Sequence, residues 1–434
     1  MRQTLGFMGR SSKEKVIGDT AREVCVRSNS KVLIAGFIEP LANQYLLGLN
    51  AMNCANGEFI VQEQVQADRK QDVLKAIDMA AKQLRGKLGE SIGSVQKFGV
   101  PIEQATTTSL EALQAYSLGI RTWYEQGDDA AIPFYKRAME LDPNFALAYA
   151  SATSSYSNLG MISEAIACGT KAYQLRDRVS ERERYFITAF YHSFAQGDLE
   201  TSIADYQLWQ RTYLRDPWAT GDLGVTYAML GQLQNALREN ERALEIGLDD
   251  ELAYANLAGA YISVNRLADA QRILDLAQQR KFGGGFLALN RYYLAFMKHD
   301  SAGMEDELAR VAGKRGSEDP LLAAQADSET YHGRIAKARE FSRKAAASAA
   351  GRGATETAAT WTAVGALHEV EIGYPALARD LAFSALKSSS GRDVQIVAAL
   401  ALARAGEGAK ARSIAEPLHK QYPQNTLIEK YWLP

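Results

Sequence analysis

Small and aromatic residues recur at a fixed spacing from about residue 109 to the end of the chain. Two adjacent units, Pro217 to Asp250 and Glu251 to Gly284, carry this pattern with the fewest departures. The matching positions, 34 apart, are Leu223-Gly224 with Leu257-Ala258, Tyr227 with Tyr261, Gly231 with Asn265, Ala236 with Ala270, and Ala243 with Ala277. A small residue at the eighth and twentieth places lets two antiparallel helices approach, and Gly at the fifteenth permits a tight turn. The pattern predicts an array of helix pairs.

The same period extends in both directions from these two units. Stepping by about 34 residues predicts nine helix pairs, which begin near Ala112, Ala146, Glu183, Pro217, Glu251, Gly285, Asp319, Ala359 and Arg392. The last stretch, Thr426 to Pro434, reads as the beginning of a tenth first helix that stops. We therefore expect a mainly α protein, an αα superhelix in which each unit buries its apolar face against its neighbours.

The first hundred residues have a different period. A short helix is expected over Ile17–Ser28 and a longer one over Arg69–Leu88. Between them, runs rich in Val, Ile, Leu and Tyr predict three antiparallel strands at Lys31–Glu39, Gln44–Asn53 and Glu58–Ala67. Pro40 with Asn43, and then the turn dipeptide Asn56-Gly57, separate the strands.

These boundaries predict three parts. A small α/β segment with a three-stranded antiparallel sheet occupies residues 1–90, a linker 91–108, and the repeat array 109–434. A segment of that length buries only a thin core. It is therefore either packed against the repeats or the end of a larger α/β domain.

Composition narrows the function classes. With 47% hydrophobic and 23% charged residues and a net charge of −2, a general attraction to nucleic acid is not expected. No apolar run reaches the length of a membrane-spanning helix, and the N-terminus has no secretory signal. A cytoplasmic location follows, or an extracytoplasmic one if the chain follows a membrane anchor in a longer protein. Cys25, Cys54 and Cys168 lie far apart and read as separate buried side chains rather than a disulfide framework.

The period and its residue types resemble tetratricopeptide repeat proteins from about Ser109 to the end. A further resemblance covers Ala21 through Ala67, Leu84 to Glu90 and Ser109 to Tyr116, which are similar to the region after the catalytic domain in bacterial serine/threonine kinases with such arrays. The chain has no GxGxxG loop, HRD or DFG motif. The resemblance thus implies a regulatory or sensor portion without the kinase domain. The same residues resemble related signalling proteins with TolB-like segments, which implies that the α/β segment is the end of a larger TolB-like domain.

The resemblance also implies where a partner would bind, since tetratricopeptide proteins line a concave groove with the first helix of each unit. At the groove places stand mostly apolar and aromatic side chains, with no Lys/Asn clamp for a terminal carboxylate. The candidate peptide-binding residues are Tyr116, Trp123, Arg184, Tyr191, Phe194, Trp218, Val225, Phe286, Tyr293 and Phe296. Such a lining suits an extended or helical apolar peptide, or alternatively packing inside a tight superhelix.

No catalytic, metal or cofactor site is predicted. The five histidines fall in separate units without the spacing of metal ligands. The run Gly283 to Gly285 has neither a preceding strand nor the Lys-Ser/Thr of a phosphate loop. The acidic pairs Asp128-Asp129 and Asp249-Asp250 stand before helices, where Asp caps amide groups.

Three hypotheses for function remain. The first is a non-enzymatic protein-interaction scaffold or sensor in a bacterial signalling system, and the second is a regulatory fragment of a kinase whose catalytic domain lies outside this chain. The third is a ligand-sensing α/β segment around Gln44 to Ala67 that the repeats read out.

Overall fold

The computed structural model describes residues 18–27, 30–42, 44–93, 95 and 107–432. By compactness the chain divides into two units. Unit 1 comprises residues 1–117, 137–146 and 177–184, and unit 2 comprises residues 118–136, 147–176 and 185–434. The predicted linker lies largely in residues 96–106, outside the described part, so the predicted boundaries at 90 and 108 stay a prediction.

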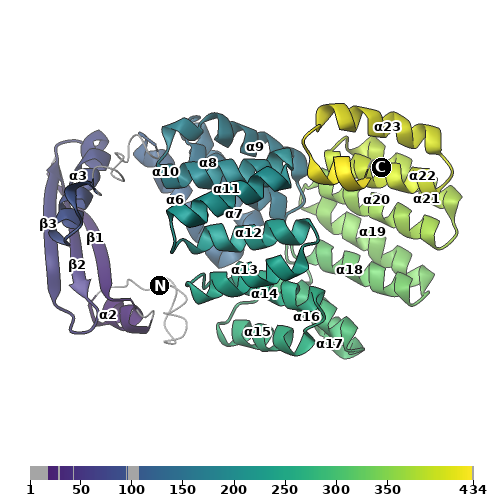
Figure 1. The fold of residues 1–434 in the computed structure, drawn as a ribbon, viewed down its shortest axis with the longest axis horizontal. Coiled ribbons are helices and arrows are strands. Elements are labelled where there is room, and N and C mark those ends of the chain that lie inside the picture. The colour runs from purple at the N-terminus through teal and green to yellow at the C-terminus, as the bar shows by residue number, and fades with distance from the viewer. Residues whose placement is uncertain (1–17, 28–29, 43, 94, 96–106, 433–434) are drawn as a thin grey trace. The chain divides into compact units, whose positions relative to one another are not determined.

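Unit 1 contains a three-stranded antiparallel sheet in the order β1-β2-β3 (Figure 1). Its elements are α2 (Gly18–Arg27), β1 (Val32–Leu41), β2 (Gln44–Asn53), β3 (Phe59–Ala67), the 3-10 turn η1 (Lys70–Asp72) and α3 (Val73–Lys87). These confirm the predicted order of helix, three strands and helix. Strand β1 departs from the prediction, because it continues through Pro40 to Leu41.

The sheet core forms where α3 covers β2 and β3. Leu47 and Ala67 from the strands meet Val73 and Ala76 of the helix, and all four are buried. They lie on one face because antiparallel partners share a face, and Tyr45 pairs with Ala67 two residues before Leu47. Leu110 packs against the same cluster.

A disulfide joins α2 to the end of β2. Cys25 and Cys54 are bonded, with 5.6 Å between their Cα atoms, and both are buried. Arg22 strengthens this junction by donating to the carbonyl oxygens of Cys54 and Ala55. The interpretation of these two cysteines as separate buried side chains was therefore wrong. The two cysteines are 29 residues apart in the sequence, so their pairing was not apparent there. In the fold the β1–β2 hairpin brings the two positions together.

The rest of the described chain consists of nine successive helix pairs (Figure 1). The first helices are α6 (Leu110–Gln126), α8 (Ala146–Asn158), α10 (Glu181–Phe190), α12 (Pro217–Met229), α14 (Glu251–Ser263), α16 (Gly285–Met297), α18 (Glu318–Tyr331), α20 (Thr355–Glu371) and α22 (Arg392–Arg404). The second helices are α7 (Asp128–Leu141), α9 (Ile162–Gln174), α11 (Leu199–Thr212), α13 (Leu233–Glu245), α15 (Leu267–Gln279), α17 (Ser301–Val311), α19 (Ile335–Gly351), α21 (Pro375–Ser388) and α23 (Gly408–Gln421).

Six of the nine first helices begin within one residue of the position expected from the sequence. Of the remaining three, α6 and α10 each begin two residues early, whereas the eighth helix, α20, begins at Thr355 rather than near Ala359. Short turns complete the array: η2 (Arg176–Arg178) and the π-helical turns η3 (Tyr191–Gln196) and η4 (Ile428–Trp432). The tenth unit that the sequence predicts is thus represented by one π-helical turn, whose Ile428 is buried.

Small residues lie where the helices of a pair are closest. In the fifth unit Ala258, Ala270 and Ala277 have no exposed surface, and they pack with Tyr261 and Ile273. An alanine side chain allows the two helix axes to approach, and the aromatic ring fills the space toward the next unit. The packing thus confirms the physical reason for the 34-residue period.

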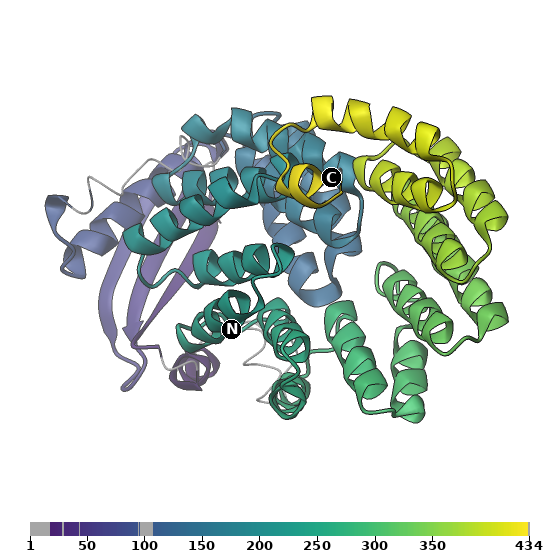
Figure 2. The same ribbon diagram turned by 45° about the vertical axis from the view of Figure 1, so that its right-hand side comes forward.

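Late helices of unit 2 also contact early ones. Helix α22 packs against α9 (Figure 2). The hydroxyl of Thr357 donates to the carbonyl oxygens of Leu159 and Gly160, and the Glu356 carboxylate accepts from the amide of Ser163. We call this set of contacts the closure. Nothing in the period of the sequence indicated it.

The last turn makes further contacts of the same kind. The amide of Thr426 donates to the carbonyl oxygen of Gly197, and its hydroxyl accepts from the amide of Leu199. Gly197 has a φ of +79°, and a Cβ there would lie 2.0 Å from the side-chain amide nitrogen of Asn425. Only glycine fits this position.

Candidate functional site

A pocket opens between the first helices of the fourth, fifth and sixth units and α13, the second helix of the fourth unit. Its volume is about 220 Å³. We call it the groove pocket. It is lined by Val225, Ala228, Leu233, Ala236, Asn240, Ala255, Asn256, Gly259, Ala260, Ser263, Phe286, Leu289 and Asn290. None of these side chains ionises, so the pocket offers apolar surface and neutral hydrogen-bonding groups.

Two glycines make room for the amide side chains of the pocket. A Cβ on Gly224 would lie 2.7 Å from the side-chain oxygen of Asn240, closer than atoms can pack. A Cβ on Gly259 would lie 3.3 Å from the side-chain oxygen of Asn290. The small residue at the eighth place of the unit therefore allows the helices to pack closely. In the fourth unit it also leaves space for the side chain of Asn240.

The asparagines of the groove pocket differ in their hydrogen bonding. Asn290 donates to the carbonyl oxygen of Ala255 at 2.7 Å, which holds its side chain across two units. The half-buried amide of Asn256 has no hydrogen-bond partner among the described residues. One donor group and one acceptor are therefore available in the pocket, beside the ring of Phe286, which is 40% exposed.

The groove pocket brings together Val225 and Phe286 of the predicted candidates, together with Leu289. Of the others, Tyr293 and Arg184 are exposed in the structure, and Tyr293 meets the ring of Tyr292 edge-on. As a set of peptide-binding residues the ten candidates stay a prediction.

The remaining predicted residues make intramolecular contacts. Tyr191 stacks on Tyr173 at 4.1 Å, and Phe194 lies 4.8 Å from the ring of Phe190. The Trp123 indole donates to the carboxylate of Asp128. The other ring contacts join Tyr116 to Phe145, Phe296 to Tyr331, and Trp218 to the buried clusters around Trp209 and Ala243. For these aromatics the packing explanation has direct support.

The pKa of one carboxyl group on α12, the first helix of the fourth unit, is raised far above its usual value. Desolvation, with a further contribution from the negative charges of Asp250 and Asp216, raises the pKa of Asp222 to about 8. Asp222, Asn256 and Asn290 are spaced 34 residues apart and hold the same place in three successive units. This column of neutral polar side chains was missed from the sequence, although its period was visible there.

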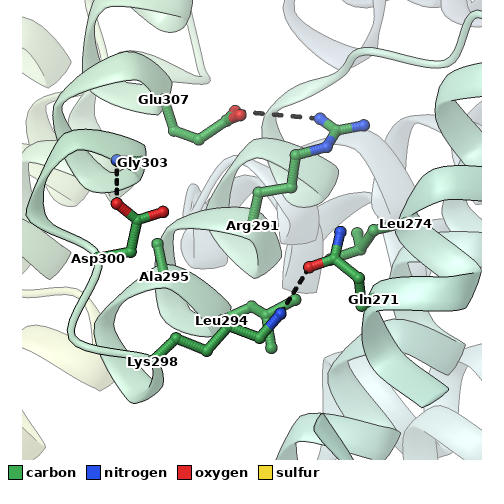
Figure 3. Close-up of a pocket in the computed structure, with 9 residues that line it drawn as sticks. All are labelled: Gln271, Leu274, Arg291, Leu294, Ala295, Lys298, Asp300, Gly303 and Glu307. Carbon is green, nitrogen blue, oxygen red and sulfur yellow. Dashed lines mark hydrogen bonds and ion pairs between the residues drawn. The ribbon is translucent and has the colours of Figure 1, made fainter. Parts of the chain in front are cut away.

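A second pocket, of about 190 Å³, lies between α15, α16 and α17 (Figure 3). Its polar groups are already used within the protein. Lys298 donates to Gln271, Asp300 accepts from the amide of Gly303 at the start of α17, and Arg291 lies 3.9 Å from Glu307. Burial lowers the pKa of Arg291. We interpret this pocket as part of the packing between the fifth and sixth units.

Within the described part of the chain, no cluster of three or more His, Cys, Asp or Glu residues could hold a metal ion. Among the same residues, no helix is both long and apolar enough to span a membrane.

Neither protein-family models nor curated proteins match this sequence. Solved structures are similar to it. One is PilW, a type IV pilus biogenesis factor, with 17% identity, coverage of 47% of this chain and 93% of that one, and a TM-score of 0.34. Another is a tetratricopeptide repeat protein from Parabacteroides merdae, with 16% identity, coverage of 55% and 93%, and a TM-score of 0.36. The APC/C hetero-tetramer Cut9–Hcn1 gives 13% identity, coverage of 78% and 64%, and a TM-score of 0.44.

The array has the fold of a tetratricopeptide superhelix. The 34-residue helix pairs, the buried alanines at the helix crossing and the groove between first helices carry this conclusion. The tetratricopeptide array is preceded by the small α/β segment with its three-stranded sheet.

Proposed function

We propose that this protein is a non-enzymatic interaction scaffold whose tetratricopeptide array binds an extended segment of a protein partner in the groove pocket. The observation that carries the proposal is the amide of Asn256, which has no hydrogen-bond partner among the described residues. It lies with exposed Phe286 on neighbouring first helices that line one pocket. An amide of this kind can donate to a peptide carbonyl and accept from a peptide N–H. The aromatic ring supplies the apolar contact that anchors a side chain.

The side chains that line the pocket limit the kinds of partner segment that can bind there. Val225, Phe286 and Leu289 favour an apolar side chain, whereas no lysine or arginine lines the pocket to hold a terminal carboxylate. The partner segment is therefore neutral and apolar where it meets the pocket, and it is recognised through its backbone and one or two anchoring side chains. Its affinity should depend only weakly on salt.

Selection of peptides on the full-length chain, followed by titration of the best binder, tests this proposal. Asn256→Ala and Phe286→Ala should each weaken binding by roughly tenfold, since groups at the centre of an interface commonly contribute more than ~1 kcal/mol. Leu214→Ala is the control, because Leu214 is 71% exposed and lies outside the pocket.

The proposal fails if well-folded Asn256 and Phe286 variants bind as tightly as the parent, or if moderate salt abolishes binding. Circular dichroism melts of each variant would establish that a loss of binding is not a loss of folding. If substitution of Tyr293 or Arg184 weakens binding instead, the site lies elsewhere along the groove and not in this pocket.

We further propose that the scaffold serves a bacterial signalling system, on the resemblance of residues 21–67, 84–90 and 109–116 to the region after a kinase catalytic domain. An extracytoplasmic location accords with the Cys25–Cys54 disulfide, because such bonds persist in oxidising compartments. The alternative is a regulatory fragment of a serine/threonine kinase. Reading the genomic sequence upstream of this chain separates the two, since an in-frame kinase domain would decide for the fragment.

A further inference from the structure

The outer edge of strand β1 is apolar and open. In the described part of the chain β2 alone pairs with β1, because the sheet order is β1-β2-β3. Ile34 and Ile38 are 54% and 50% exposed, and Val32 and Leu41 are exposed as well. An edge strand of ten residues with this composition is a template for pairing with another strand.

The hydrogen bonds to β2 establish which residues face the open edge. The amide of Cys54 donates to the carbonyl oxygen of Lys31, and the register places Val32 opposite Asn53. Directly opposite residues of an antiparallel pair alternate between hydrogen-bonded and non-hydrogen-bonded pairs. Odd-numbered residues therefore bond to β2, while the backbone groups of even-numbered residues point away from it.

The open edge is bounded at both ends. Pro40, an even-numbered residue, has no N–H to offer, which explains why β1 can continue through a proline. At the other end the N–H of Ser30 already donates to the carbonyl oxygen of Cys25. Between these two positions the edge presents four N–H groups, those of Val32, Ile34, Gly36 and Ile38.

We propose that this edge is a self-complementary interface, in which β1 pairs antiparallel with β1 of a second copy of the chain. One register pairs all four N–H groups. It places Val32 opposite Ile38 of the second copy and Ile34 opposite Gly36, so that each copy's four donors meet the four carbonyls of the other. A shift by two residues would place Val32 opposite Pro40, which has no N–H to return. The two sheets thus join into one six-stranded sheet.

The side chains between these pairs match in the same register. Lys31 comes opposite Glu39 of the second copy, and the two-fold axis repeats this ion pair. Leu33 comes opposite Phe37, and Ala35 meets its own copy on the axis. Side chains approach most closely in such non-hydrogen-bonded pairs, so opposite charges there attract and a small residue is favoured on the axis. This self-complementarity favours a second copy over an unrelated strand as the occupant.

Charge reversal tests the interface by sedimentation of the full chain over a range of concentrations. Lys31→Glu and Glu39→Lys each replace two attractive pairs by two repulsive ones, and each should weaken the dimer at least about fivefold. An equimolar mixture of the two variants restores both attractive pairs and should form a heterodimer. Lys75→Glu on α3, also an exposed charge reversal, is the control and should dimerise like the parent.

Cross-linking tests the register. Ala35→Cys should give a disulfide-linked dimer under mild oxidation, with the linked peptide identified by mass spectrometry, whereas Gln64→Cys on β3 should not. A parent chain that stays monomeric at the highest soluble concentration would overturn the proposal. So would a dimer that neither charge reversal weakens, since that dimer must use another surface. The experiment is independent of peptide binding in the groove pocket, so either proposal can fail alone.

Discussion

The guanidinium of Arg352 donates to the carbonyl oxygen of Leu159 at 2.9 Å, although 193 residues separate them. The same side chain is paired with Asp319, and the two side chains are only 2% and 1% exposed. Removing one partner of a buried ion pair leaves the other charge without compensation. We expect Arg352→Ala to lower the free energy of unfolding by about 3–5 kcal/mol, measured by urea denaturation followed by circular dichroism.

Arg315 provides the matched control for that prediction. It also joins distant parts of unit 2, since it pairs with Asp129 at 2.7 Å, but its side chain is 59% exposed. An exposed ion pair contributes little, so Arg315→Ala should cost less than about 1 kcal/mol. Equal effects of the two substitutions would contradict the expectation that the buried ion pair contributes more to stability than the exposed one.

The turns inside four successive units share one backbone conformation that suits glycine. Gly231, Asn265, His299 and Gly333, spaced 34 residues apart, have φ values of 69°, 59°, 58° and 71°. A side chain at this φ is strained. His299→Gly should therefore raise the free energy of unfolding by about 0.5–1 kcal/mol, the relief of strain exceeding the added entropy of the unfolded chain.

Two glycine substitutions check the sign of that effect in the same denaturation assay. Gly231→Ala should destabilise the array by about 1–2 kcal/mol because alanine would take the left-handed conformation. Gly351→Ala, within helix α19 and with no atom within 4 Å of the added methyl group, should be neutral or stabilising. Destabilisation at both positions would show that the turn conformation is not the cause.

The repeat array was predictable from sequence because its determinants are local. Ala258 and Tyr261 recur at a period that follows from the packing of each helix pair, and the predicted start of α14 at Glu251 is confirmed. The closure was not predictable, since Thr357 meets Leu159 through the cumulative turn of many units and not through any local pattern. The Cys25–Cys54 bond was not predicted either, because the two cysteines are 29 residues apart and come together only in the folded β1–β2 hairpin.

Of the residues that line the groove pocket, the predicted candidates include Val225 and Phe286 and none of the polar side chains. Val225 and Phe286 stood out because large apolar residues at groove places are easily noticed. Asn256 was overlooked because the groove prediction rested on large apolar side chains, although Asp222, Asn256 and Asn290 recur at 34-residue spacing. Only the contacts show that the amide of Asn290 is bonded, whereas the amide of Asn256 has no partner in the part of the chain that the structure describes. Hydrogen-bond satisfaction is a property of the folded arrangement.

The cysteines should differ in reactivity. Cys25 and Cys54 are bonded to each other, and burial raises the pKa of the Cys168 thiol to about 11, which leaves little thiolate at neutral pH. Alkylation of the native protein should be slow. After denaturation without reductant one thiol should react, and after denaturation with reductant three. Three rapidly alkylated thiols in the unreduced, denatured protein would contradict the disulfide.

The stability of the array should fall as the pH rises from about 4 to about 8. Burial raises the pKa of Asp222 to about 8 and that of Asp128 to about 6, and it also raises the pKa of Glu356. Since these carboxyls have a pKa near ~4 when unfolded, the folded chain binds more protons than the unfolded chain in this range. Folding is therefore favoured at the acidic end and disfavoured as the groups ionise.

Thermal melting points measured between about pH 5 and pH 8.5 test this dependence. Asp222→Asn should flatten the decline between about pH 6 and pH 8, because it removes the group whose pKa is raised furthest into that range. Asp306→Asn, which alters an exposed carboxyl on α17, should leave the decline unchanged. Carboxyls whose pKa is lowered in the folded chain, such as Glu318 and Glu329, change the stability only below about pH 4.5. They therefore do not obscure the decline at higher pH. A melting point that rises steadily toward pH 8 would show that Asp222 is ionised in the folded array.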